Sequence, residues 1–194
     1  MPDECDDVVI ETERLLLRNW READRAEMFA HLTSQPAVME HMGGPQTREE
    51  SDAGIDRCIA SQSKNGHCFW ALERKDNGLF LGFCGLKRVD GDGAPDLGSP
   101  EIGWRLRQEA WGQGFAKESA IASMDFAFDQ LDAEFVSAFT IDGNTSSWGL
   151  MKRLGMTRRP DLDYWDAKWG PVVGPEIVYR IVAKDWAQTR KDLT

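Results

Sequence analysis

The stretch Glu101–Glu118 reads EIGWRLRQEAWGQGFAKE and decides the fold that the chain can adopt. Its first six residues read as a β-strand, and a helix begins at Phe115, directly after Gly112-Gln113-Gly114. Glycines let the backbone turn sharply and approach a ligand closely, and a helix N-terminus offers unpaired N–H groups at the positive end of its dipole. This arrangement predicts either a cradle for a pyrophosphate or a plain connection from strand to helix.

Two common nucleotide-binding motifs do not fit this loop. A Walker loop ends in Gly-Lys-Ser/Thr, whereas Gly114 is followed by Phe115 and Ala116. A dinucleotide fingerprint needs a third glycine at position 117, where this chain has a lysine. That fingerprint also belongs to a parallel βαβ unit, whereas the residues before this loop predict an antiparallel meander.

The residues upstream of the loop predict a helical layer and this meander. Asn77-Gly78 between two β-rich runs is the strongest short hairpin signal in a sequence. Thr47 with Glu50 three residues later forms a capping box that opens a helix. We expect helices over residues 22–32 and 47–63, and strands over residues 12–20, 68–74, 79–88 and 101–106.

Downstream of the loop, strands and helices alternate. Gly155 is a good residue to end a short helix that starts after Asn144. We expect helices over residues 115–131 and 145–154, and strands over residues 135–141, 156–159 and 176–183. Antiparallel strands followed by strand–helix alternation predict a mixed sheet in an α/β or α+β domain.

The loop is one of four blocks that together resemble the GNAT-type N-acetyltransferases. Glu109–Gly114 (EAWGQG) is similar to the family's (Q/R)-x-x-G-x-(G/A) acetyl-CoA loop between a strand and a helix. Further on, Asn144–Ser147 and then Leu154-Gly155-Met156 resemble the family's N-x-x-S and L-G-F. The opening TERLLLR and the closing VYRIVAKDW are similar to the RimJ/RimL-like branch, the ribosomal-protein-alanine acetyltransferases. The resemblance spans about residues 10–187.

This resemblance implies a fold and a reaction. The fold is a single α+β domain over residues 11–194, with a central twisted, mostly antiparallel sheet flanked by helices and splayed between its fourth and fifth strands. The reaction is acetyl transfer from acetyl-CoA to a primary amine by direct attack, without a metal. The acceptor is either a protein N-terminus or a small amine.

The resemblance also implies which residues hold the cofactor. The peptide groups of Trp104, Arg105 and Leu106 would bind the pantetheine, although the Trp104 side chain also suits ordinary sheet packing. Asn144 would bind the pantetheine, cap the following helix, or do both. Arg107 and Gln108 would stand at the entrance, where Arg107 is otherwise a solvated surface residue. The pyrophosphate would lie on the backbone amides of Gly112, Gln113, Gly114, Phe115, Ala116 and Lys117.

Two side chains are candidates for the chemistry. Glu101 lies on the fourth strand near the expected opening and would accept the proton of the attacking amine; otherwise it only ends a strand. Ser147 matches a family position proposed to protonate the leaving thiolate, or it is a helix-surface serine without a role. In the C-terminal segment, Tyr164, Trp165 and Trp169 either form an apolar wall beside the acceptor or are ordinary aromatic packing.

The chain departs from the family pattern at positions that leave alternatives open. Glu109 replaces the usual Gln or Arg, and Met151 stands where many members carry a tyrosine acid. One alternative is a non-catalytic acyl-CoA-binding or regulatory module of the same fold. Another is a nucleotide-binding enzyme that uses the glycine loop.

Composition excludes several other classes of protein. The 194 residues carry a formal net charge of −10, so a non-specific nucleic-acid binder is not expected. Six of the acidic residues fall within the first 13 positions, which predicts a flexible acidic tail over residues 1–10. No apolar run is long enough for a membrane span, and neither Cys nor His shows metal-ligand spacing. We expect a cytoplasmic monomer or homodimer whose cysteines are reduced.

Overall fold

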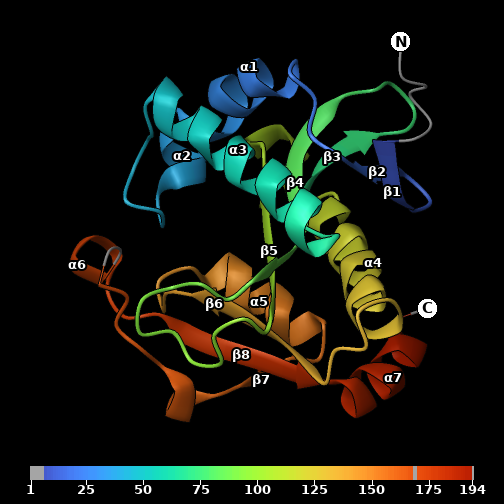
Figure 1. Ribbon diagram of the computed structural model, residues 1–194, viewed down its shortest axis with the longest axis vertical. Helices are drawn as coiled ribbons and strands as arrows, with labels where there is room; N and C mark the ends of the chain where they lie inside the picture. Colours follow the sequence, from blue (N-terminus) through green and yellow to red (C-terminus); the bar gives the residue numbers. More distant parts are fainter. Residues whose placement is uncertain (1–6, 168–169, 194) are drawn as a thin grey trace. The chain divides into compact units, whose positions relative to one another are not determined.

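A computed structural model of the protein describes residues 7–167 and 170–193, and its strands form one mixed sheet (Figure 1). The strand order is β1-β2-β3-β4-β5-β6-β8-β7, and the register between β5 and β6 is parallel. This confirms the predicted fold class. The strands are β1 (Val8–Glu11), β2 (Leu15–Arg18), β3 (Phe69–Arg74), β4 (Phe80–Arg88), β5 (Pro100–Leu106), β6 (Phe135–Thr140), β7 (Thr157–Arg158) and β8 (Ile177–Val182).

The helices also follow the sequence prediction in most places. The helix expected over residues 22–32 is shorter than predicted and continues as a π-helical turn. The predicted capping box is present, with the Thr47 side chain accepting from the Glu50 N–H and the Glu50 side chain accepting from the Thr47 N–H. The helical elements are α1 (Asp24–Met28), η2 (Phe29–Thr33), α2 (Pro36–Met39), α3 (Arg48–Asn65), η3 (Gln108–Ala110), α4 (Phe115–Asp129), α5 (Thr145–Arg153), η4 (Pro160–Leu162), α6 (Gly170–Val173) and α7 (Ala183–Asp192).

The predicted acidic tail overlaps a strand. Residues 1–6 lie outside the described residues, but Val8–Glu11 form β1, which pairs antiparallel with β2. Three consecutive β-branched residues (VVI) favour a strand in spite of the acidic residues around them. The predicted boundary at residue 10 therefore falls inside β1.

The chain divides into two compact units, the first comprising residues 1–40, 44–87 and 103–123. In this unit, helices α1 and α3 pack on strands β3 and β4 through Met28, Ile55 and Phe80. A buried ion pair adds to this core: the Arg18 guanidinium donates to both carboxylate oxygens of Asp24, at 2.7 and 2.8 Å. Arg18 also pairs with Glu73 at 2.7 Å, so its charge is neutralised where water is excluded.

Side chains alternate across the sheet of this first unit. Cys84 of β4 contacts Ser123 of α4, with 3.7 Å between Sγ and Oγ. The neighbouring Phe83 packs against the cluster in which residues of α1, η2 and α3 meet Ala71 of β3 and Phe80 of β4. Adjacent residues in a strand point to opposite faces, so α4 covers one face and the α1–α3 layer covers the other.

The second unit comprises residues 41–43, 88–102 and 124–194. Its centre is the antiparallel pair β6–β8, with β7 added at the edge of β8. Helix α7 follows β8 and was not predicted. Its Trp186 stacks on Phe128 at 6.3 Å between ring centroids and donates to the Asp125 carboxylate.

Candidate active site

The glycine loop of the first unit presents a row of free backbone donors. Gly112 and Gly114 have φ angles of 72° and 84°, which L side chains rarely adopt, and α4 begins at Phe115. Within the described part of the chain, the N–H groups of residues 112–117 have no hydrogen-bond acceptor, and the first paired amide is Glu118, which donates to the Gly114 carbonyl. Successive unpaired amides at a helix N-terminus suit an anion such as a pyrophosphate.

Glu118 holds this loop in place. Its carboxylate accepts from the Thr12 hydroxyl at 2.6 Å and from the Arg14 backbone N–H at 2.9 Å. The Arg14 guanidinium pairs with Glu118 at 2.7 Å and donates to the Gln113 carbonyl at 3.0 Å. Burial acts against ionisation, but these hydrogen bonds outweigh it and lower the pKa of Glu118 below its ordinary value.

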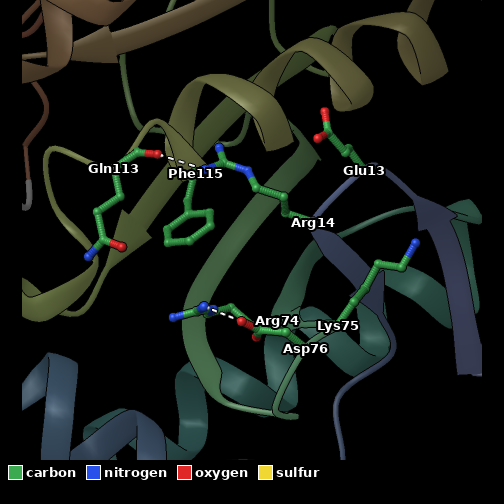
Figure 2. Close-up of a pocket in the computed structure, with 7 residues that line it drawn as sticks. All are labelled: Glu13, Arg14, Arg74, Lys75, Asp76, Gln113 and Phe115. Carbon is green, nitrogen blue, oxygen red and sulfur yellow. Dashed lines mark hydrogen bonds and ion pairs between the residues drawn. The ribbon is translucent and has the colours of Figure 1, made fainter.

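A cavity of about 400 Å³ lies beside the loop (Figure 2). The Phe115 ring is buried, and the Arg14 and Arg74 guanidinium carbons lie 4.5 and 5.5 Å from its centroid. Arg74 pairs with Asp76, and Lys75 pairs with Glu11. Since Arg14 is paired with Glu118, each cation of this cavity is already balanced by a carboxylate. The cavity lining is Glu13, Arg14, Arg74, Lys75, Asp76, Gln113 and Phe115.

The predicted pantetheine strand β5 differs in exposure along its length. Trp104 and Arg105 are half-buried, while Leu106 is buried. The Leu106 carbonyl accepts from the Trp111 indole N–H at 2.8 Å, so that carbonyl is already paired. The Arg105 guanidinium carbon lies 5.4 Å from the centroid of Phe83.

The structure places Arg107 inside the first unit rather than at a solvated entrance. Its side chain is 10% exposed. The guanidinium donates to the Phe80 carbonyl at 3.2 Å, contacts His31 Nδ1 at 3.0 Å and pairs with Glu109 at 3.2 Å. These contacts attach the end of β5 to β4 and to η2. Its predicted contact with the cofactor stays a prediction.

Glu101, Asn144 and Ser147 all belong to the second unit. Glu101 is half-buried and lies opposite Ser137 in the parallel register of β5 and β6. The strands β5 and β6 are the pair between which the resemblance predicts a splay.

Asn144 is the N-cap of α5, which is one of the two roles that the sequence predicted for it. Its side-chain oxygen accepts from the Ser147 N–H at 3.2 Å and from the Ser146 hydroxyl at 3.0 Å. Its side-chain NH₂ has no acceptor among the described residues, so this group is free to donate to a ligand. Met151 is buried in α5, at 2% exposure.

Tyr164 lies near Glu101, and the sequence did not predict this proximity. Burial, followed by the negative charges of Glu176 and Glu101, raises the pKa of Tyr164 above its ordinary value. Its ring packs edge-on against Phe139 at 5.7 Å. Because Tyr164 lies far from Glu101 in the sequence, no local motif could have indicated their proximity. Trp165 is exposed, and Trp169 lies outside the described residues.

Two further features concern metals and membranes. Over residues 7–167 and 170–193, no group of three or more His, Cys, Asp or Glu side chains could hold a metal ion. Within the same residues, no helix combines the length and the apolar character needed to cross a membrane.

Comparison with known proteins places this chain among the acetyltransferases. Residues 14–157 match the family described as Acetyltransferase (GNAT) domain. The uncharacterized N-acetyltransferase p20 of Bacillus licheniformis is 29% identical over 160 residues, which cover 81% of this chain and 87% of that protein. An acetyltransferase structure from Agrobacterium tumefaciens covers 89% of this chain and 92% of that one, with a TM-score of 0.76 at 24% identity. The match to a ribosomal-protein-S5-alanine acetyltransferase from Vibrio fischeri covers 93% of this chain and 99% of that one, with a TM-score of 0.70 at 15% identity.

Proposed function

Because this chain belongs to the acetyltransferase (GNAT) family, we propose that it transfers the acetyl group of acetyl-CoA to a primary amine by direct attack. The observation that carries this proposal is the row of free amides over residues 112–117, which fits a pyrophosphate. The acceptor is a protein N-terminus, as in the ribosomal-protein-alanine branch that the sequence resembles, or a small amine. The reaction takes place in the cytoplasm.

The proposal assigns binding roles to the glycine loop, to β5 and to Asn144. The loop amides bind the pyrophosphate, because both glycines hold the backbone in a conformation that leaves the N–H groups unpaired. The peptide groups of Trp104 and Arg105 and the free NH₂ of Asn144 bind the pantetheine. An N–H near Trp104 donates to the oxyanion, an interaction worth about 3 kcal/mol in the transition state.

Bound acetyl-CoA supplies the thioester whose carbonyl carbon the amine attacks. Glu101 accepts the proton that the amine loses, directly or through a water molecule. When the carbon–sulfur bond breaks, the thiolate takes a proton from a donor on this chain, for which we propose Ser147. Met151 has no proton to give, so the tyrosine acid of many relatives has no counterpart at this position.

The test begins with binding. Calorimetry should detect binding of acetyl-CoA and no binding of ATP. Gly112→Val should weaken the affinity for acetyl-CoA ten-fold or more, because a side chain at this position changes the loop backbone. Gly98→Val is the matched control, since Gly98 also has a positive φ and open space around it, but lies in another loop. ATP binding without acetyl-CoA binding would favour the nucleotide-binding alternative.

Release of free thiol from acetyl-CoA with a panel of amines then tests catalysis. The expected result is amine-dependent release, with the acetylated product identified by mass spectrometry. Acetyl-CoA binding without release for any amine would support the non-catalytic alternative.

A further inference from the structure

Arg105 stands apart from the other arginines of the structure. Arg18 and Arg107, which are buried, each lie within 4.0 Å of a carboxylate. Arg57 and Arg153 have no carboxylate that close within the part of the chain that the structure describes, but they are exposed to water. Arg105 is half-buried, and among the described residues its guanidinium has neither a carboxylate within 4.0 Å nor a hydrogen-bond acceptor.

The surroundings of Arg105 are aromatic rather than polar. Its guanidinium carbon lies 5.4 Å from the centroid of Phe83, and Phe83 is stacked on Phe69 at 5.5 Å with the rings 16° apart. Trp20 contacts Phe83 from another side, at 6.5 Å between centroids. A cation–π contact compensates only part of the cost of removing a guanidinium from water. Burial lowers the pKa of Arg105 to about 10, so the side chain still carries its charge at neutral pH.

Arg105 and the helix that offers the free amides lie on opposite faces of the first unit's sheet. Arg105 lies over Phe83, which packs on the α1–α3 layer, whereas α4 contacts the opposite face through Cys84. The free amides that suit the pyrophosphate are at the N-terminus of α4. The guanidinium of Arg105 therefore lies on the other face of the first unit's sheet from the helix that would hold the cofactor phosphates.

We propose that Arg105 binds a carboxylate of the acceptor, so that the substrates are small amines carrying a carboxylate, such as free amino acids. This inference rests on the proposed function. A guanidinium donates two parallel hydrogen bonds to a carboxylate, a geometry that neither an amide nor a second amine offers. A peptide N-terminus and a polyamine would leave the Arg105 charge unpaired, and the enzyme discriminates against them for that reason.

The experiment compares free amino acids with their C-terminal amides, because an amide reproduces a peptide N-terminus without the carboxylate. With the wild-type chain we expect kcat/KM for the best amino acid to exceed that for its amide ten-fold or more. Arg105→Gln should remove this preference by lowering the value for the acid, and Arg105→Lys should keep part of it. Arg57→Gln removes an exposed arginine from α3 and should leave both values unchanged.

Several results would overturn the inference. One is equal use of acid and amide by the wild-type chain, and another is an Arg105→Gln variant that keeps the preference. A ten-fold loss of acetyl-CoA affinity in Arg105→Gln, with the preference retained, would assign the side chain to a cofactor phosphate instead. If Arg105→Gln does not fold, the wild-type preference and its reduction in Arg105→Lys decide.

A binding arm separates this inference from the proposed function. If no amine is acetylated, the proposed function fails. The carboxylate site can still be tested, because calorimetry compares the affinities of N-acetyl-L-phenylalanine and N-acetyl-L-phenylalaninamide for the chain loaded with coenzyme A. Tighter binding of the acid, lost in Arg105→Gln, supports the carboxylate site. Equal affinity for the two compounds, or binding of neither, overturns it.

Discussion

Glu101 is the side chain on which proton removal depends in the proposed reaction. Glu101→Gln keeps the size and the hydrogen-bonding capacity of the side chain but cannot accept the amine proton at neutral pH. We expect turnover to fall ten-fold or more, with little change in the affinity for acetyl-CoA. Steady-state thiol release and calorimetry measure the two quantities. Glu134→Gln, an exposed change in the second unit, is the control, and unchanged turnover in Glu101→Gln would refute the assignment.

Individual residues also show where sequence reasoning reaches its limit. The sharp turn and the free amides of the loop could be predicted from its residues. The φ preference of glycine and the unpaired N–H groups of a helix N-terminus are both local properties. The environment of Arg107 could not be predicted, since the Phe80 carbonyl and His31 come from distant parts of the chain. The unpaired state of Arg105 and the proximity of Tyr164 to Glu101 likewise depend on tertiary contacts.

At the level of elements, the capping box of α3 allows a stability prediction. Thr47→Ala removes the acceptor of the Glu50 N–H, so we expect a loss of about 1 kcal/mol in the free energy of unfolding. For a chain of this size the melting temperature should fall by about 2–4 °C. Calorimetric melting measures this change. Ser63→Ala, an exposed change near the end of the same helix, should have almost no effect, and an equal loss in both variants would contradict the capping role.

The elements that were predicted share local signals, and those that were missed lack them. The hairpin between β3 and β4, the start of α3 and the cap of α5 follow from Asn-Gly, a capping box and an Asn N-cap. The N-cap of α7 is Val182, which makes no side-chain cap hydrogen bond, so no sequence signal marked that helix. Strand β1 was hidden by its acidic flanks, and the π-helical turn at Phe29–Thr33 has no sequence signature.

For the molecule as a whole, Glu118 predicts sensitivity to acid. Its pKa is lower in the folded chain than the ordinary value of 4.5, so the unfolded chain binds the proton more readily. The stability that Glu118 contributes is therefore complete at neutral pH and is lost as the pH falls below about 4.5. Glu118→Gln should lower the melting temperature at pH 7 by about 2–6 °C, because it weakens charge-assisted hydrogen bonds to Thr12 and Arg14.

The same variant should make the melting temperature less dependent on pH between 4.5 and 3. Differential scanning calorimetry across that range measures both effects. A variant whose melting temperature falls with pH as steeply as that of the wild-type chain would exclude Glu118 as a source of the acid sensitivity. Glu49→Gln, an exposed change in the first turn of α3, serves as the control.

The cysteines of this protein decide how cleanly its reaction can be followed. Cys58, Cys68 and Cys84 are free thiols, and burial raises the pKa of Cys58 and of Cys84 to about 11. Only thiolates attack the chromogenic disulfides used to count coenzyme A, so these side chains react slowly at neutral pH. The colour that develops in a thiol-release assay then reports product and not protein. Cys5 lies outside the described residues and can be replaced by serine. The thiols of the folded enzyme then add almost nothing to the signal of the assay.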